Sequence, residues 1–306
     1  MALDGVLIFA NPISGRGRGQ TIARRLEQRL QAEGREVRCF LEPPASITAD
    51  ALLPDPAVAI IIGGDGTLRA VARRLLNAPN AATHTAALTP PLLLVPMGTA
   101  NLMGRHLGIR WPHEHPEARI AAALDRHAIV PLDAAVANGE LFLLMAGVGI
   151  DAGVVHAMER RRTGPITRAS YLWPMIQTIA NYRYLPLRVT IDGRVAFESA
   201  PAIAFVGNVP EYGTGFPMLP EAIGDDGLLD VCVLPCRSLN QAMHHLLAAI
   251  ASEHVHGPGV VHSRGKRIRI ESPVSSPVQV DGEAAGHTPL DIALLDGRIP
   301  FIVEKQ

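Results

Sequence analysis

A glycine-rich loop, Gly63-Gly64-Asp65-Gly66-Thr67, separates a run of apolar residues from an amphipathic stretch. Glycine lets the backbone approach a ligand closely, and the free N–H groups at the start of a following helix attract an anion. The Asp65 carboxylate would repel a phosphate, so we expect it to contact a cation or a hydroxyl. The pattern predicts a phosphate-binding loop, and a strand–helix turn without a ligand is the alternative.

Two further polar loops that contain glycine, Asn11–Gly15 and Pro96–Asn101, also follow apolar runs. Because the carboxyl ends of parallel strands meet at one edge of a sheet, we expect the three loops to converge on one crevice. The candidate nucleotide contacts come from these loops and the helix after the second one: Asn11, Gly63, Gly64, Asp65, Gly66, Thr67, Arg69 and Thr99.

The only lysines of the chain are Lys266 and Lys305. A P-loop, which needs a Gly-Lys-Ser/Thr sequence, is therefore excluded, and backbone amides, arginines or a metal must hold any phosphates in the N-terminal half. Arg69 is a candidate for this charge, and a solvated helix side chain is the equally weighted alternative.

The elements that must position the loops alternate in type. Apolar runs predict strands over Val6–Phe9, Val37–Leu41, Ala57–Ile62 and Leu92–Val95, and helical spacing predicts helices over Thr21–Glu33 and Leu68–Leu76. The continuous β-branched run of Ala57–Ile62 is typical of a strand buried on both faces of a parallel sheet. These repeated strand–loop–helix units predict a doubly wound α/β domain.

The sequence pattern changes near residue 132, where predicted strands separated by hairpin turns begin. We predict strands over Leu141–Met145, Leu187–Ile191, Ala202–Val206, Leu229–Leu234, Arg267–Ile270 and Val278–Val280, and helices near Arg168–Tyr182 and Ser238–Ser252. This pattern favours an antiparallel, β-rich second domain. We place the domains at residues 1–131 and 132–295.

Composition excludes several classes of protein. With 28 basic and 29 acidic residues the net charge is −1, which argues against a nucleic-acid partner. Three scattered cysteines are too few for a disulfide framework and indicate a reducing, cytoplasmic location. No stretch approaches the roughly 18 apolar residues of a membrane span, and the start lacks a signal peptide. The pairs in His113–His115 and His254–His256 lack a third metal ligand, and we expect them to be solvated.

An acid pair, Asp281-Gly282-Glu283, follows a short apolar strand near the C-terminus. Phosphoryl transfer from ATP to an alcohol needs a positioned γ-phosphate, a divalent metal and a base for the hydroxyl proton. A carboxylate can be that base, and general-base catalysis contributes about 10²- to 10⁴-fold in rate. The alternative is an exposed turn between two strands.

Five motifs follow one another along the chain: Asn11-Pro12-Ile13-Ser14-Gly15, Gly63–Thr67, Pro96–Asn101, Gly224–Asp230 and Val280–Glu283. Together they resemble the catalytic-domain family of diacylglycerol kinases, specifically the soluble bacterial lipid kinases of about this length. The resemblance spans nearly the whole chain. It implies an N-terminal phosphofructokinase-like doubly wound domain, to which about residues 296–306 return, and a C-terminal antiparallel β-sandwich domain for the lipid.

The resemblance also implies an activity and a set of partners. It implies an ATP- and Mg²⁺-dependent kinase that binds ATP between its domains and phosphorylates a lipid with a free hydroxyl. Such an enzyme would be cytoplasmic and would meet the membrane transiently and peripherally. A homodimer is compatible with the sequence, which does not determine the oligomeric state. Arg160–Arg162 is a candidate basic membrane contact, or else a solvated helix end.

Specific residues receive roles from the resemblance. Glu283 would be the base, with Asp281 beside it in the active-site network. Asp226 would hold a structural Mg²⁺ together with the backbone carbonyls of Ile223 and Leu228. Asp133 would join a network with Asp65, water and Mg²⁺.

The chain departs from the family pattern at three places. Arg69-Ala70 replaces the usual Asn-Glu, Leu102 replaces an Asp, and Phe40-Leu41 stands where a nucleotide-contacting Thr is common. Two rival interpretations remain. An NAD-kinase-like enzyme shares Gly-Gly-Asp-Gly-Thr, but the Asn-Glu dipeptide of that family is absent here. A non-catalytic nucleotide-binding regulatory protein would tolerate the departures, but the intact Glu283 argues against it.

Overall fold

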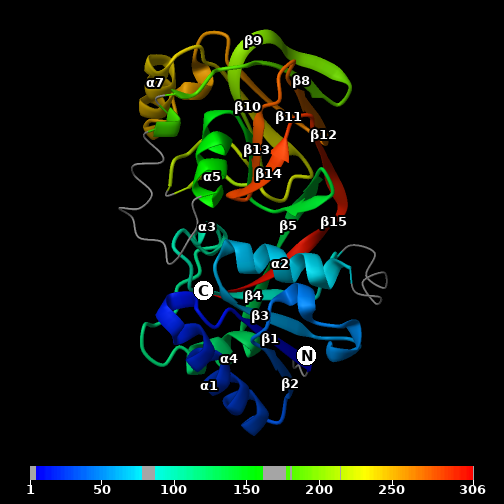
Figure 1. Ribbon diagram of the computed structural model, residues 1–306. Coiled ribbons are helices and arrows are strands. Elements are labelled where there is room, and N and C mark those ends of the chain that lie inside the picture. Colours follow the sequence, from blue (N-terminus) through cyan, green and yellow to red (C-terminus); the bar gives the residue numbers. More distant parts are fainter. Residues whose placement is uncertain (1–4, 78–86, 161–176, 180, 214, 306) are drawn as a thin grey trace. The chain divides into compact units, whose positions relative to one another are not determined.

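The computed structural model describes residues 5–77, 87–160, 177–179, 181–213 and 215–305. The chain divides into two compact units (Figure 1). The first, here called the α/β unit, comprises Met1–Leu132 and Asp296–Gln306, and the second, the β-rich unit, comprises Asp133–Leu295. Two long strands, β5 (His127–Ala137) and β15 (Leu290–Glu304), contribute residues to both units.

The α/β unit is built on a parallel sheet. Its strands are β1 (Gly5–Ala10), β2 (Glu36–Phe40), β3 (Val58–Gly63), β4 (Leu92–Pro96) and the end of β15, in the order β15-β4-β3-β1-β2. The register pairs Ile8 with Ile60 and Ile60 with Leu93. Every residue of β3 is buried, as its continuous apolar run predicts.

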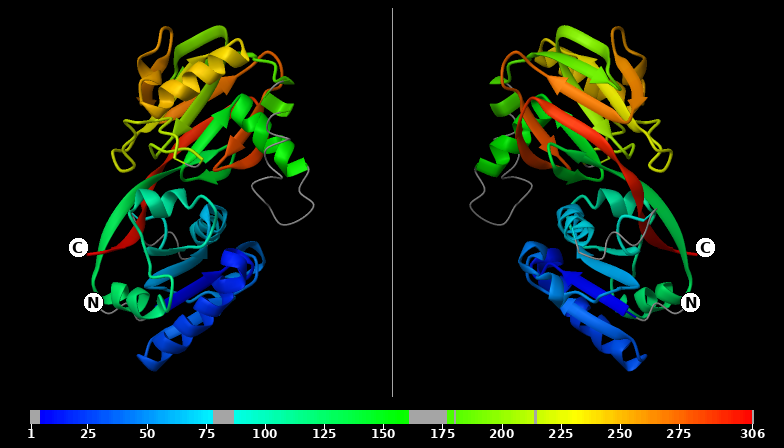
Figure 2. Two further views of the ribbon diagram at one scale, coloured as in Figure 1. Left: turned by 90° about the vertical axis from the view of Figure 1, so that its left-hand side faces the viewer. Right: turned by 90° about the vertical axis from the view of Figure 1, so that its right-hand side faces the viewer.

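Helices cover both faces of this sheet (Figures 1 and 2). On one face lie α1 (Arg18–Ala32) and α4 (Glu117–Asp125), and on the other lies α2 (Asp65–Leu76). Apolar residues of α1 at Ile22, Leu26 and Leu30 share a core with β1, β3 and α4. The shorter helices of this unit are η1 (Ser14–Gly17), η2 (Pro44–Ser46), η3 (Ala49–Ala51) and α3 (Leu102–His106).

The β-rich unit is an antiparallel sandwich whose two sheets share β9 (Arg194–Gly207). The first half of β9 pairs with β8 (Pro186–Ile191), which continues to β12 (Arg267–Glu271) and β15. The second half lies between β7 (Met145–Val148) and β10 (Leu229–Pro235). The remaining strands are β6 (Glu140–Phe142), β11 (Val261–Gly265), β13 (Pro277–Val280) and β14 (Glu283–His287).

The described part of this unit also contains the helices α5 (Ile150–Arg160), α7 (Leu239–Ile250) and η5 (His254–His256). The main core collects apolar residues from facing strands, including Phe142, Val189, Val206, Val231 and Ile292. The described residues contain no helix that is long and apolar enough to cross a membrane.

The predicted fold class, a doubly wound α/β domain followed by an antiparallel sandwich, is confirmed. One predicted strand, Leu141–Met145, is wrong, because the chain breaks into β6 and β7 at Leu143 and Leu144, whose N–H groups bond a side chain rather than a strand. Helix α5 and the long strands β5 and β15 were not predicted. Arg161, Arg162 and most of the helix expected near Arg168–Tyr182 lie outside the described residues.

Candidate functional site

Backbone hydrogen bonds join the three glycine-bearing loops at the carboxyl ends of β1, β3 and β4. The N–H of Asn11 donates to the carbonyl of Ile62 at 3.0 Å. The N–H of Met97 donates to the carbonyl of Gly63 at 2.8 Å, and the N–H of Gly15 donates to the carbonyl of Met97 at 3.2 Å. The structure therefore brings together the three loops that the sequence singles out.

The loops pack so closely that a side chain at either of two facing glycines would press against backbone. A Cβ added to Gly64 would lie 3.0 Å from the Cα of Gly98, and one added to Gly98 would lie 2.7 Å from the Cα of Gly64. The atom that such a Cβ would meet is a backbone Cα in both cases, and backbone cannot rotate away as a side chain can. Glycine at these positions is thus required by loop-to-loop contact as well as by any ligand.

Asp65, the first residue of α2, connects the second loop to the third. Its carboxylate accepts the N–H of Leu102 at Oδ2 (2.9 Å) and the N–H of Met103 at Oδ1 (3.1 Å). The sequence predicted a cation or a hydroxyl as the partner of Asp65. The structure shows another kind of partner, the backbone N–H groups at the start of a helix. A carboxylate suits that place because it accepts N–H groups that have no intrahelical partner.

The other predicted nucleotide contacts lie in the same loops or directly after them. Oδ1 of Asn11 accepts the N–H of Ile13 at 3.1 Å, which shapes the first loop. Thr67 packs against Gly63 at the start of α2, and Arg69 is half-buried on that helix. Gly66 and Thr99 are exposed, so the linked loops present both residues to solvent.

The acid pair of the β-rich unit lies on the hairpin between β13 and β14. Asp281 and Gly282 have φ values of 51° and 81°, the positive values that a type I′ Asp-Gly turn needs. The Asp281 carboxylate accepts three backbone N–H groups, from Leu143 (2.9 Å), Leu144 (2.9 Å) and Met145 (3.0 Å). Asp281 therefore anchors the hairpin, while Glu283 begins β14 with an exposed side chain.

A buried polar network contacts this hairpin from the interior of the unit. The Gln279 side chain, fully buried, accepts the N–H of Gly282 at 2.9 Å and donates to Oδ2 of Asp151 at 3.4 Å. Oδ1 of Asp151 is buried and has no hydrogen-bond partner among the described residues. Burial raises the pKa of Asp151 to about 6, against the opposing effect of its hydrogen bonds.

Asp151 is not among the predicted site residues, although the sequence before it carries a signal. Gly147-Val148-Gly149-Ile150 precedes it, so a glycine-bearing turn leads from a strand to a helix, as at Gly63–Thr67. Gly149 has φ 135°, a conformation that L residues rarely adopt. A carboxylate at the start of a helix after such a turn is therefore a detectable pattern.

Of the three residues expected to hold a structural Mg²⁺, Asp226 has protein partners for both of its carboxylate oxygens. Oδ1 of Asp226 accepts the N–H of Leu228 at 3.0 Å, and Oδ2 lies 3.6 Å from Nη1 of Arg264. Ile223 is about half exposed, and Asp133 accepts the N–H of Gly227 at Oδ2 (2.6 Å). The guanidinium of Arg264 thus lies beside the Asp226 carboxylate, and the structural Mg²⁺ at this position stays a prediction.

Arg264 also forms an ion pair with a more deeply buried carboxylate, that of Asp230. Its Nε donates to Oδ1 of Asp230 at 3.0 Å, and the Asp230 side chain is 1% exposed. Oδ2 of Asp230 has no hydrogen-bond partner within the described part of the chain. Burial raises the pKa of Asp230, and the guanidinium of Arg264 counteracts this.

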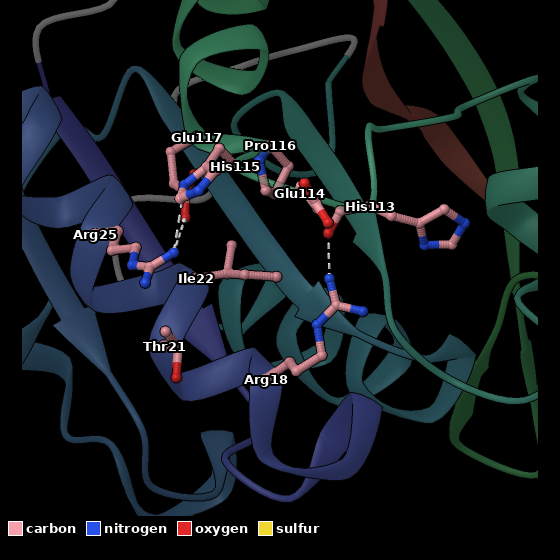
Figure 3. Close-up of a pocket in the computed structure, with 9 residues that line it drawn as sticks. All are labelled: Arg18, Thr21, Ile22, Arg25, His113, Glu114, His115, Pro116 and Glu117. Carbon is pink, nitrogen blue, oxygen red and sulfur yellow. Dashed lines mark hydrogen bonds and ion pairs between the residues drawn. The ribbon is translucent and has the colours of Figure 1, made fainter.

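The two histidine clusters differ in their surroundings. His113 and His115 line a pocket of about 480 Å³ between α1 and the residues before α4, where Arg18 bonds the carbonyl of His113 and Arg25 lies 3.7 Å from Glu117 (Figure 3). In the described residues no group of three His, Cys, Asp or Glu side chains could hold a metal. His254 is buried 3.0 Å from the carbonyl of Met218, so the expectation of a solvated residue is wrong there.

Comparison with known proteins covers both units. Residues 5–136 match the family model of the diacylglycerol kinase catalytic domain, and residues 145–303 match that of the YegS C-terminal NAD kinase beta sandwich-like domain. A diacylglycerol kinase from Staphylococcus haemolyticus is 27% identical, over 97% of this chain and 88% of its own. Another, from Mycobacterium tuberculosis, is 26% identical, over 97% and 94%.

Solved structures show the same relationship. A diacylglycerol kinase from Bacillus anthracis superposes with a TM-score of 0.71 at 27% identity, covering 98% of this chain and 97% of its own. An NAD kinase from Archaeoglobus fulgidus in complex with ATP, at 12% identity and a TM-score of 0.53, shares the fold. Since the two family models together span both units and the motifs lie within them, the chain belongs to the diacylglycerol kinase family and is a kinase.

Proposed function

We propose that this protein transfers the γ-phosphate of ATP to the hydroxyl of a lipid such as diacylglycerol. The observation that carries the proposal is the set of three linked glycine loops in a chain that belongs to this family. The relatives from Staphylococcus haemolyticus and Mycobacterium tuberculosis are named diacylglycerol kinases, which gives the substrate class. The α/β unit takes the nucleotide and the β-rich unit takes the lipid.

In this proposal the loops hold the phosphates of ATP. The backbone around Gly64, Gly66 and Thr67 at the start of α2 is suited to an anion, because the first N–H groups of a helix have no intrahelical acceptor. Asn11 and Thr99 lie on the neighbouring loops, and Arg69 follows on α2. ATP arrives as its Mg²⁺ complex, in which the metal offsets the negative charge of the phosphates.

Glu283 is the proposed general base. Its carboxylate is exposed at the first residue of β14, and the hairpin that carries it is fixed by Asp281 and Gln279. A positioned carboxylate can accept the proton that the lipid hydroxyl loses during transfer. Asp281 contributes by holding the hairpin, since its oxygens accept three backbone N–H groups.

The test is a phosphorylation assay with purified protein, γ-labelled ATP and Mg²⁺. The acceptors are diacylglycerol, phosphatidylglycerol and a sphingoid base in mixed micelles, and NAD in solution. Label in one lipid, identified as its phosphate monoester, is the expected result. Label in NAD alone would favour the NAD-kinase-like alternative, and ATP binding without any transfer would favour a regulatory protein.

A further inference from the structure

Helix α7 of the β-rich unit presents its large aliphatic side chains to solvent. Five of them are between 36% and 63% exposed: Leu239, Met243, Leu246, Leu247 and Ile250. Their spacing of four, three, one and three residues places them on one face of a 3.6-residue helix. The helix therefore carries a continuous outward stripe, here called the α7 stripe.

The inward face of α7 is made of smaller or polar residues. Ala249 is fully buried, Ala242 packs against the core around Cys236, and His245 lies 2.8 Å from the carbonyl of Pro235. Folding of the unit alone would favour the opposite orientation, because burying the larger apolar surface is more stabilising. An apolar stripe left outside marks a surface that meets a partner.

Charge selects among the partners that an apolar stripe can meet. Residues 237–252 contain no Asp or Glu, while Arg237 and His244 are exposed. Along α7 the stripe is thus flanked by neutral or basic groups, and the first acidic residue, Glu253, is exposed just after the helix ends. A surface of apolar chains beneath negatively charged groups complements this arrangement.

Size argues against a second copy of the chain as the partner. A helix of 12 residues is about 18 Å long, and a stable interface uses about 20–30 residues from each side. Helix α7 lies at the outer edge of its unit (Figures 1 and 2), and the stripe offers five large side chains. An interfacial helix needs no more than this, since its apolar face sinks only about 5–10 Å into a bilayer.

We propose that α7 docks the protein on an anionic lipid bilayer, with the α7 stripe inserted among the acyl chains and Arg237 at the headgroups. The inference rests on the proposed lipid kinase function, which requires contact with a bilayer. The helix is already formed for this role, because the Ser238 hydroxyl accepts the N–H of Gln241 at its start (3.4 Å).

Flotation of the full chain with vesicles tests the surface. Vesicles of phosphatidylcholine with phosphatidylglycerol are compared with vesicles of phosphatidylcholine alone. The double variant Leu247→Gln/Ile250→Gln should bind the anionic vesicles at least about tenfold more weakly than wild type. Val274→Gln, which alters another exposed aliphatic residue of the same unit, should bind like wild type. Arg237→Gln should reduce the preference for anionic vesicles.

Two further measurements separate this inference from the proposed function. Phosphorylation of a water-soluble short-chain diacylglycerol should be equal in wild type and the double variant, while phosphorylation of vesicle-borne diacylglycerol should fall in the variant. A wild type that binds vesicles through α7 but phosphorylates no lipid would uphold the surface and contradict the proposed function. Equal vesicle binding by wild type and variant would overturn the inference, as would a dimer in sedimentation that the double variant abolishes without changing vesicle binding.

Discussion

The carboxylate of Asp65 accepts a hydrogen bond from the backbone N–H of Leu102 at 2.9 Å, so that the start of α2 holds the start of α3. Asp65 lies in the second glycine-bearing loop, and Leu102 directly follows the third. Met103 donates to the same carboxylate at 3.1 Å, and both oxygens are therefore occupied. The charge of Asp65 organises the loops that we propose to bind the nucleotide.

Asp65→Asn should destabilise the α/β unit as well as slow turnover. An asparagine retains one acceptor oxygen and directs N–H groups at Leu102 or Met103, which are themselves donors. Hydrogen bonds to charged groups contribute about 1.5–3 kcal/mol each, so we expect the free energy of unfolding to fall by about 1–3 kcal/mol in urea titrations. Asp50→Asn, at an exposed residue of η3, is the matched control and should leave stability unchanged. A turnover defect without any loss of stability would instead point to a direct metal contact by Asp65.

Asp281→Asn separates the charge of this residue from its backbone conformation. Asparagine tolerates the φ of 51°, but it lacks the second acceptor oxygen that bonds Leu143. We expect a loss of about 1–3 kcal/mol in unfolding free energy, and a larger loss in Asp281→Ala, which also strains the turn. If both variants were as stable as wild type in chemical denaturation, the anchoring role of Asp281 would be contradicted.

Glu283→Gln tests the proposed base. The amide keeps the shape of the side chain but cannot accept the hydroxyl proton at neutral pH, so turnover should fall by about 10² or more. ATP binding by calorimetry and the melting temperature should match wild type, because the side chain is exposed. Glu198→Gln, at an exposed side chain of β9, is the control and should turn over normally. Near-normal lipid phosphorylation by Glu283→Gln would show that another group, or none, takes the proton.

Asp151 makes stability depend on pH in a direction opposite to that of a typical carboxylate. Its folded pKa of about 6 lies above the ordinary value of 3.8, so folding favours the protonated form and the charged form costs stability. The cost is absent below about pH 4, grows as pH rises to about 6, and is constant above that.

Asp151→Asn should therefore be more stable than wild type at pH 8, by on the order of 1–3 kcal/mol, and equally stable near pH 4. Urea unfolding at a series of pH values measures the difference. A difference that does not change with pH would mean that Asp151 does not titrate in this range.

Arg264→Met should leave the buried Asp230 without the guanidinium that donates to it, with His262 still 3.6 Å from its Oδ1. Removing one member of a buried pair costs about 3–5 kcal/mol at neutral pH. Because burial already raises the pKa of Asp230 and Arg264 counteracts this, the pKa should rise further in the variant. The deficit should consequently shrink as pH is lowered through the folded pKa and Asp230 becomes neutral.

The double variant Asp230→Asn/Arg264→Met should recover most of the stability lost in Arg264→Met, since no charge then remains buried. Arg269→Met, which breaks an exposed pair with Asp291, should cost less than about 1 kcal/mol. If Arg264→Met and Arg269→Met lost similar amounts of unfolding free energy in denaturant titrations, the burial of Asp230 would not be what makes the Arg264 pair important.

Local patterns in the sequence were sufficient for much of the α/β unit. The β-branched run Ala57–Ile62 predicts the strand found at Val58–Gly63, and helical spacing predicts α1 and α2. The glycine loops follow from the residues between these elements. Hydrophobic periodicity records which face of an element is buried, and that information lies within a few neighbouring residues.

The partners of the charged side chains could not be predicted in the same way. Asp281 bonds residues 136 to 138 positions away, and Asp65 bonds residues 37 and 38 positions away. Each carboxylate satisfies backbone groups of a different element, and the register of that element sets which groups are near. The strand predicted over Leu141–Met145 failed for this reason, because Asp281 takes the amides in its middle.

Helix α7 shows most clearly which features follow from the sequence and which depend on the tertiary structure. The sequence determined that residues near Ser238–Ser252 form an amphipathic helix, since that depends on propensity, on spacing and on the Ser238 cap. It also determined the order of motifs that identifies the family. Only the tertiary structure decided that Ala249 faces the core and that Leu247 and Ile250 face solvent. A helix can bury either face, and the choice depends on the space that the other elements leave beneath it.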